Sequence, residues 1–257
     1  LATNKITKVY GILNGTCNYI MSEMERTKQS FKNVLKMAQK LGYAEPGNPK
    51  LDLNGYDALA KIKILSSLAF NKQISKSKCL MEGIENIDYT DIKIADQLDF
   101  RIKLLGITEI INNTIFERVH PCLIKKDSYI GNVGGVMNAV ILNGSPIGES
   151  VLQGEGAGPG PTSSALMSDL LSILRGNIKY PFGISKNKRL KPKIFNKDQS
   201  SNSLYFRLEV KDKPGVLSSI TKILATYKIS IQRLIQIPDH KSKTASIVLI
   251  THNANEL

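Results

Sequence analysis

The chain of 257 residues has few of the features that mark membrane-spanning, secreted or disulfide-bonded proteins. No apolar run approaches the roughly 18 residues that a membrane-spanning helix needs. The first residues are polar and lack the positive-then-apolar pattern of a secretory signal. The 3 cysteines are far apart and form no CxxC pair, and an odd number argues against a disulfide framework. We therefore expect a protein of the reducing cytoplasm, with no membrane partner.

Arginine is also scarce, although the chain is basic. Lys and Arg together number 35 and the net charge is +13, but lysines supply most of that total and are spread over the whole sequence. Guanidinium groups are the side chains that best recognise phosphates and guanine edges. The charge therefore favours a solvated lysine surface and no nucleic-acid partner, with nucleic-acid binding as an alternative.

Two further signatures are missing. No GxGxxG motif follows a strand near the N-terminus, so the sequence shows no dinucleotide-binding fingerprint. The histidines His120, His240 and His252 have no cysteine or carboxylate partners at metal-ligand spacing, so we predict no metal site.

Hydrophobic residues make up 42% and charged residues 22% of the chain, as in globular proteins. Patterning predicts a strand over 6–13, helices over 31–41, 56–70 and 90–98, and then strands from 101 onward with a hairpin turn at Asn112-Asn113. Residues 204–251 read strand, helix, strand, strand. We expect an α/β (α+β) fold in which a mixed open sheet carries helices on one face. The expected domains are residues 1–185 and 204–257, joined by a lysine- and proline-rich linker over 186–203.

The segment LGYAEPGNPKLDLNGYDALAKIKIL, residues 41–65, contains an unusual lysine. At 100° per residue, Asp57 and Lys61 share one helical arc with Ile64, Leu65 and Leu68. An exposed i,i+4 ion pair contributes only about 0.2–0.5 kcal/mol, which is too little to offset the burial of an ammonium group. The pattern thus predicts a buried, functional lysine, with an ordinary surface ion pair as the alternative.

The loop before this helix carries Glu45 and Asp52. Two carboxylates near a lysine suit a substrate with an ammonium group, and the lysine could pass a proton to a carbonyl oxygen. Both carboxylates could equally be solvent-facing loop residues.

The runs GILNGTCNYI, LGYAEPGNPKLDLNGYDALAKIKIL, VGGVMNAVILNG and GEGAGPGPTSSA occur in order within residues 6–175, and together they resemble homoserine dehydrogenase. This family reduces aspartate 4-semialdehyde to homoserine with NADP or NAD, in the biosynthesis of threonine, methionine and isoleucine. The resemblance implies that Lys61 is the catalytic proton donor and acceptor and that Asp57 orients it. Glu45 and Asp52 would hold the substrate's amino group, and EPGNPKLD has one extra residue, with Asn48 where an acidic residue is common. Gly15 and Thr16 would contact the substrate.

The glycine-rich stretch GEGAGPGP leads into a helix expected from Thr162. Glycine amides at a helix N-terminus can approach an anionic group closely, although such loops often only turn the chain. In the resembling family this stretch lies beside the cofactor, which implies contacts from Gly156, Ala157 and Gly158. The nucleotide-binding fold of the family precedes the point where this chain begins. The resemblance therefore implies a fragment that is inactive by itself.

Residues 204–257 resemble a partial ACT domain, a small ferredoxin-like module that commonly binds amino acids. Asp212, Pro214 and Gly215 match its turn motif, and the resemblance implies threonine as a possible effector. The resemblance implies a homoserine dehydrogenase with a small-molecule substrate, and we expect a homodimer because an open sheet commonly pairs across a two-fold axis. A non-catalytic amino-acid sensor is the alternative function.

Overall fold

The structure is a computed structural model that describes residues 3–47, 49–177, 180, 182–194, 201–239 and 242–255. Asn48, His240 and residues 195–200 of the expected linker lie outside the described residues. The chain divides into two compact units, Leu1–Ile194 and Phe195–Leu257. Within the described residues, no helix is long and apolar enough to cross a membrane.

The first unit is built on a six-stranded mixed sheet with the strand order β2-β4-β3-β1-β5-β6. Its strands are β1 (Lys5–Ile12), β2 (Leu80–Met81), β3 (Phe100–Ile111), β4 (Thr114–Lys125), β5 (Met137–Ser145) and β6 (Gly148–Glu155). All neighbouring strands are antiparallel except β2 and β4, which are parallel. This confirms the expected α/β class with a mixed open sheet.

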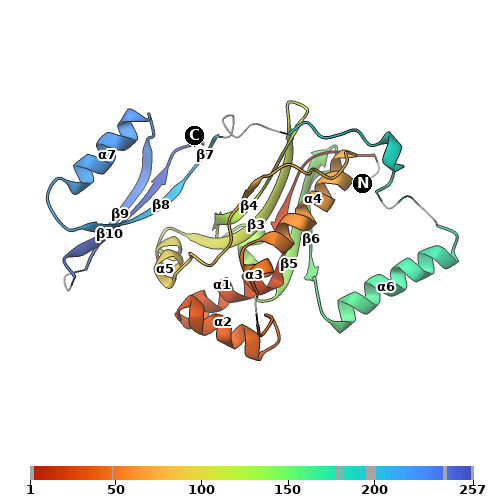
Figure 1. The fold of residues 1–257 in the computed structure, drawn as a ribbon, viewed down its shortest axis with the longest axis horizontal. Coiled ribbons are helices and arrows are strands. Elements are labelled where there is room, and N and C mark those ends of the chain that lie inside the picture. The colour runs from red at the N-terminus through yellow and green to blue at the C-terminus, as the bar shows by residue number, and fades with distance from the viewer. Residues whose placement is uncertain are drawn as a thin grey trace. The chain divides into compact units, whose positions relative to one another are not determined.

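Helices cover one face of this sheet (Figure 1). They are α1 (Gly15–Thr27), α2 (Phe31–Lys40), α3 (Lys50–Leu53), α4 (Tyr56–Phe70) and α5 (Tyr89–Gln97). The 3-10 turn η1 (Ile130–Asn132) follows β4, and its Ile130 packs with Leu105 and Ile107 in a separate, smaller core cluster. The larger core lies between the helices and the sheet. Val9, Ile20, Met24 and Ile62 belong to it, and each is fully buried.

Local sequence explains where several of these elements begin and end. The Ser30 side chain accepts a hydrogen bond from the Asn33 amide and so caps α2. Asn112 and Asn113 have φ values of 49° and 61°, and they close the β3–β4 hairpin between Ile111 and Thr114. Asparagine tolerates this left-handed conformation, so the predicted hairpin turn is confirmed.

The glycine-rich stretch differs from the expectation in two ways. Gly154 and Glu155 form the end of β6, a strand that the sequence pattern does not predict, and α6 (Pro159–Leu174) begins three residues before Thr162. Proline is favoured in the first turn of a helix, because its missing N–H has no intrahelical partner there. No described residue of α6 is buried.

The part of the predicted linker before residue 195 is attached to the first unit. The Gln73 amide donates to the Leu190 carbonyl (2.9 Å), and the Ile115 amide donates to the Lys193 carbonyl (2.7 Å). This segment includes the 3-10 turn η2 (Lys186–Lys188), and the Arg189 guanidinium stacks on the Phe182 ring. Backbone pairing of this kind gives residues 186–194 a fixed course along the unit.

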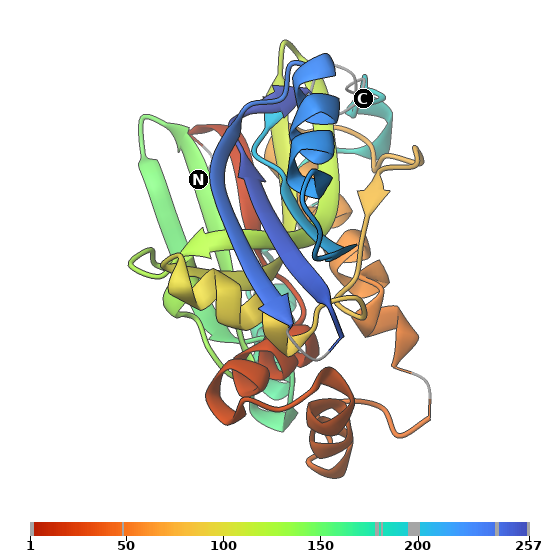
Figure 2. The same cartoon turned by 90° about the vertical axis from the view of Figure 1, so that its left-hand side faces the viewer.

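The second unit has the expected strand, helix, strand, strand order. Its antiparallel sheet, ordered β8-β10-β9, consists of β8 (Tyr205–Lys211), β9 (Ile231–Asp239) and β10 (Thr244–Thr251). The helix α7 (Val216–Thr226) runs alongside these strands (Figure 2). A further short pair joins β7 (Ser201–Asn202) to β11 (Ala254–Asn255).

Candidate functional site

The turn between β1 and α1 is the centre of the candidate site. Asn14 is the N-cap of α1, and its side-chain oxygen accepts from the Cys17 amide at 2.9 Å. Its amide nitrogen donates to Asp52 Oδ1 (2.8 Å) and to Asp57 Oδ2 (2.9 Å). One buried asparagine therefore connects two of the predicted carboxylates.

Lys61 completes this group from the first turns of α4. Its ammonium donates to Asp57 Oδ2 at 2.8 Å and to the Leu13 carbonyl oxygen at 3.0 Å. An ammonium has three N–H donors, so one remains for a ligand. Leu13, Asn14, Asp52, Asp57 and Lys61 thus form one hydrogen-bonded cluster, which we call the Lys61 cluster.

The prediction that Lys61 lies on a buried stripe is wrong. The Lys61 side chain is 48% exposed and Asp57 is 30% exposed, and Ile64 and Leu68 are both 44% exposed. The buried face of α4 is instead formed by Ala58, Ile62, Ser66 and Phe70. Helix α4 has apolar residues on all sides, so hydrophobic periodicity selects the wrong arc. The Lys61 ammonium is nonetheless held in place by its two bonds.

Cys17 lies directly beside the Lys61 cluster but remains a protonated thiol. Its Sγ donates to the Asp52 carbonyl at 3.2 Å. Burial raises the pKa of the Cys17 thiol far above its ordinary value, and the charges of Asp52 and Asp57 raise it further. A protonated thiol is a poor nucleophile, so the chemistry of this site belongs to Lys61 and the carboxylates.

Gly15 and Thr16 are the first two residues of α1, beside Asn14. A Cβ at Gly15 would lie 2.7 Å from the Val136 carbonyl oxygen, so only glycine fits this close approach. The Thr16 hydroxyl donates to the Tyr43 carbonyl at 2.6 Å and ties the turn to the loop after α2. The backbone amides of the first helical residues have no intrahelical acceptor.

Glu45 is not brought into the Lys61 cluster. It is exposed, and its backbone carbonyl accepts a hydrogen bond from Gln39 Nε2 at 3.1 Å. The structure thus joins Asp52, Asp57 and Lys61, while the Glu45 side chain lies on the outside of the loop.

The glycine-rich segment reaches the same turn through Asn138 on β5. A Cβ at Gly156 would lie 2.8 Å from the Asn138 side-chain carbon, and one at Gly15 would lie 3.3 Å from Asn138 Oδ1. Asn138 therefore lies between the two glycines and keeps Gly156 close to the N-terminus of α1. Ala157 and Gly158 follow in the exposed turn before α6.

The first turn of α6 offers few backbone amides for an anionic group. Pro159 and Pro161 carry no N–H, and the Thr162 amide donates to the Gly158 carbonyl at 3.1 Å. Gly160 alone offers an amide in this turn. The segment suits close contact between its backbone and a bound group better than it suits a phosphate held by several helix amides.

The predicted effector residues Asp212, Pro214 and Gly215 line one cavity of about 380 Å³ in the second unit. Gly215 is the N-cap of α7, and Gln236 Nε2, from another lining residue, donates to Asp212 Oδ1 at 3.4 Å. Within the described residues, no group of three His, Cys, Asp or Glu side chains could hold a metal ion.

Three residues of the site are not indicated by the sequence patterns. The Leu13 carbonyl and the side chains of Asn14 and Asn138 all contribute to the geometry above. Asn14 was detectable, because asparagine before a helix is a common N-cap. The Leu13 carbonyl and the Asn138 contact depend on chain segments that meet only in the folded protein.

These features define a two-unit α/β protein with a lysine–carboxylate site in the first unit and a small α/β module in the second. The family model for homoserine dehydrogenase matches residues 1–171, and the model for the ACT domain matches residues 205–257. The chain belongs to the homoserine dehydrogenase family.

Individual relatives agree with the family assignment. The homoserine dehydrogenase of Neisseria gonorrhoeae is 42% identical over 262 residues, matching 100% of this chain and 60% of that protein. A crystal structure of a homoserine dehydrogenase from Thiobacillus denitrificans has 38% identity and a TM-score of 0.90, matching 100% of this chain and 59% of that one. The chain thus spans about 60% of the length of the curated relatives it matches.

A hyperthermophilic archaeal homoserine dehydrogenase mutant in complex with NADPH also matches, with 22% identity and a TM-score of 0.57. That match covers 68% of this chain and 50% of that one. At this identity the similarity concerns the fold alone.

Proposed function

We propose that this chain forms the substrate-binding and catalytic part of a homoserine dehydrogenase, which interconverts L-aspartate 4-semialdehyde and L-homoserine with NADP or NAD. The observation that carries the proposal is the Lys61 cluster. Its ammonium is fixed by Asp57 Oδ2 (2.8 Å) and by the Leu13 carbonyl (3.0 Å), and it keeps one N–H for a substrate oxygen. Family membership supplies the reaction class.

Lys61 donates a proton to the aldehyde oxygen as that oxygen gains charge, and it removes the proton from the hydroxyl in the reverse direction. Asp57 positions the ammonium through their ion pair. When bound, the nicotinamide cofactor supplies or accepts the hydride. A positioned acid of this kind typically accelerates a reaction by about 10²- to 10⁴-fold.

The substrate is an amino acid, and both of its charged ends have complementary groups near the Lys61 cluster. Asp52 accepts from Asn14 through Oδ1, and its carboxylate is suited to the substrate ammonium. Glu45, on the loop before it, supplies a second carboxylate if that loop closes over the substrate. The free amides of Gly15 and Thr16, at the positive end of α1, suit the substrate carboxylate.

Gly156, Ala157 and Gly158 are the residues that would contact the cofactor. Gly156 packs against Asn138, which leaves the backbone of this turn close to the N-terminus of α1. NADPH is bound by the archaeal relative, and we infer a nicotinamide cofactor of either kind here.

The second unit, as an ACT domain, is expected to bind an amino-acid effector, with threonine as our candidate. Asp212, Pro214 and Gly215 would form that site in the cavity of about 380 Å³. We further infer a homodimer, because an open sheet commonly pairs across a two-fold axis. The described free cysteines fit a cytoplasmic enzyme of threonine, methionine and isoleucine biosynthesis.

The test compares Lys61→Ala with Lys63→Ala in the full-length protein. Lys63 is on the same helix, but its ammonium donates to the Ser77 carbonyl on another side. Lys61→Ala should lower kcat for homoserine oxidation by about 10²- to 10⁴-fold while cofactor affinity stays near that of the wild type. Lys63→Ala should keep wild-type turnover.

Near-wild-type turnover of Lys61→Ala would reject the catalytic assignment. Absence of any turnover in the wild-type protein, with amino-acid binding retained, would instead identify a sensor.

A further inference from the structure

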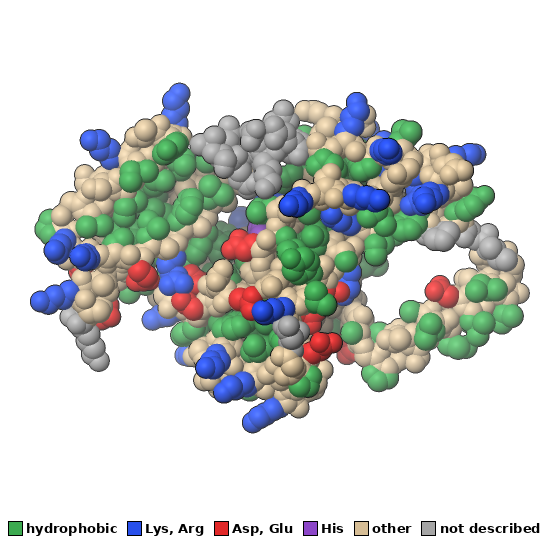
Figure 3. Space-filling model, in the orientation of Figure 1, with side chains coloured by type: hydrophobic (Ala, Val, Ile, Leu, Met, Phe, Trp, Pro, Cys, Tyr) green, Lys and Arg blue, Asp and Glu red, His purple; other side chains and the backbone are tan. Residues whose placement is uncertain are grey.

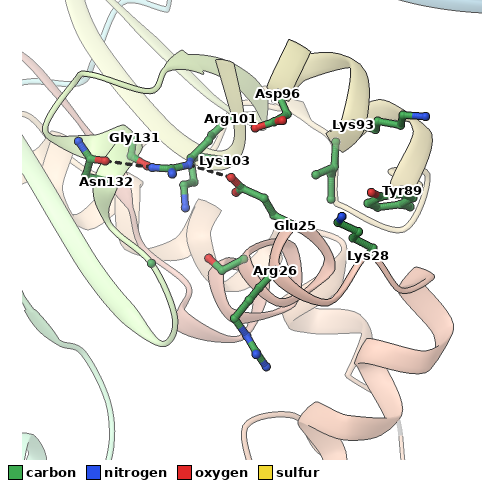
Figure 4. Close-up of a pocket in the computed structure, with 13 residues that line it drawn as sticks. Glu25, Arg26, Lys28, Tyr89, Lys93, Asp96, Arg101, Lys103, Gly131 and Asn132 are labelled. Carbon is green, nitrogen blue, oxygen red and sulfur yellow. Dashed lines mark hydrogen bonds and ion pairs between the residues drawn. The ribbon is translucent and has the colours of Figure 1, made fainter. Parts of the chain in front are cut away.

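A second cleft lies in the first unit at the opposite end of α1 from the Lys61 cluster. It is formed by α1, α5, β3 and the η1 segment, and its volume is about 500 Å³ (Figure 4). This volume is within the usual range for small-molecule sites. Asn14 and Ser22 are eight residues apart along α1, which corresponds to about 12 Å. The cleft is therefore separate from the Lys61 cluster.

The lining of this cleft carries an excess of positive charge. Two carboxylates, Glu25 and Asp96, stand against five cationic side chains: Arg26, Lys28, Lys93, Arg101 and Lys103. Both carboxylates are already paired, Glu25 with Arg101 (3.0 Å) and Asp96 with Lys126 (2.5 Å).

Some of the cationic side chains have an acidic partner and others do not. Arg26 has one: it extends away from the other cations in Figure 4 and forms an ion pair with Glu23 at 2.6 Å. Lys28 and Lys93 make no ion pair within the part of the chain that the structure describes. The cleft therefore retains positive charge that its own carboxylates do not neutralise.

Lys103 on β3 is the most unusual of these cations, because it is only 3% exposed. Its ammonium donates to Asn18 Oδ1 (2.9 Å) and to the Val133 carbonyl (2.7 Å), which are both neutral acceptors. Burial lowers the pKa of Lys103 to about 8, although the nearby Glu25 acts in the opposite direction. The amine is thus still mainly protonated at pH 7, and its third N–H remains for an anion.

Ser22 provides an independent indication of a ligand. Ser22 is one of the lining residues, and its hydroxyl oxygen is buried just beneath the cleft surface without a hydrogen-bond partner among the described residues. A buried hydroxyl without an acceptor is costly. An anionic group beside Lys103 would supply that acceptor and would also place a negative charge next to the buried ammonium.

The cationic groups stand at two ends of the cleft. Figure 4 shows Arg101 and Lys103 together on the strand side, while Lys28 lies near Tyr89 on the helix side with its ammonium towards the cleft, and Lys93 points outward from α5. A ligand with one anionic group would satisfy only one of these ends. We propose that this cleft binds a small organic dicarboxylate, with one carboxylate on Lys103 and Ser22 and the other on Lys28.

The test is isothermal titration of succinate into the full-length protein at pH 7 and constant ionic strength, with succinamide as the uncharged control. We expect saturable binding of succinate and none of succinamide. Lys28→Gln and Lys103→Met should each weaken binding about tenfold or more, since each removes a charged hydrogen-bond donor. Lys36→Ala, on the exposed side of α2, is the matched control and should bind as the wild type does.

Ser22→Ala guards against misfolding as an explanation, because it removes only a hydroxyl without a partner. This variant should keep or raise the melting temperature without ligand, while succinate binding weakens severalfold. Lys61→Ala should bind succinate normally, which separates this cleft from the proposed catalytic site. The proposal is overturned if succinate does not bind, if the cleft variants bind it like the wild type, or if Lys61→Ala alone abolishes binding.

Discussion

Asn14 is the residue on which the geometry of the Lys61 cluster depends. Its side chain performs two tasks at once: the oxygen caps α1 through the Cys17 amide, and the nitrogen bridges Asp52 and Asp57. Two carboxylates repel one another when they are close. The Asn14 amide and the Lys61 ammonium together allow both to face the same small volume.

These two tasks can be separated by substitution. Asn14→Ser keeps a capping oxygen but loses the amide donor, so stability should stay close to wild type while kcat falls by about 10- to 100-fold through misplacement of Asp57 and Lys61. Asn14→Ala should lose the same activity and, in addition, about 1 kcal/mol of stability. Urea unfolding and steady-state kinetics on both variants measure the difference. Equal stability of the two would show that the cap is unimportant.

At the scale of elements, the sequence predicts best those features, such as helix caps and turns, that depend only on neighbouring residues. The cap at Ser30 and the turn at Asn112-Asn113 depend on neighbouring residues, and both are confirmed. The orientation of α4 depends on what packs against it. The segment YDALAKIKILSSLAF offers apolar residues on every side, so its buried face is set by β1 and β3 and cannot be read from the sequence.

The unpredicted strand β6 has a similar explanation. It is an edge strand with largely exposed residues, so it lacks the alternation that half-buried strands show. Residues 186–194 carry many lysines and a proline and look like a linker, but their backbone pairs with the Gln73 and Ile115 segments. For the candidate site, the sequence predicts Lys61, Asp57 and Asp52, while the Leu13 carbonyl and Asn138 depend on long-range contacts.

A buried polar cluster links α4, β3 and β4 on the side of the unit that carries Lys63. Glu117 on β4 is 7% exposed and forms side-chain hydrogen bonds with Ser66 and Ser75. Ser66 Oγ also accepts from Thr108 Oγ1 at 3.1 Å. Burial raises the pKa of Glu117, although these hydrogen bonds and Lys63 act in the opposite direction.

This raised pKa predicts how stability changes with pH. Above the ordinary value of 4.5, the unfolded chain releases the Glu117 proton more readily than the folded protein does, so ionisation favours unfolding. Glu117 therefore lowers stability as the pH rises from 4.5 to the folded pKa, and its effect is constant above that. Glu117→Gln removes the titrating carboxyl and with it this dependence of stability on pH. Melting temperatures between pH 4 and 8 should show the variant gaining stability relative to the wild type as pH rises, and a constant difference would contradict the prediction.

At the scale of the whole molecule, α6 stands out because no described part of the unit buries its apolar residues. Leu166, Met167, Leu170, Leu171 and Leu174 are all at least 42% exposed. Figure 3 shows hydrophobic side chains along this helix. Leu152 on β6, which precedes it, is 64% exposed. A contiguous apolar surface of this kind is normally covered by another protein surface.

We therefore expect residues 1–257 alone to self-associate through α6. Leu170→Glu combined with Leu174→Glu places two charges on the apolar face, and it should shift the sedimentation of the chain at micromolar concentration towards a single smaller species. Ser168→Glu combined with Ser172→Glu has the same spacing and charge on the other side of the helix, and it should sediment as the wild type does. If both double variants dissociate equally, net charge is the cause. If neither changes the sedimentation, α6 is not the self-associating surface.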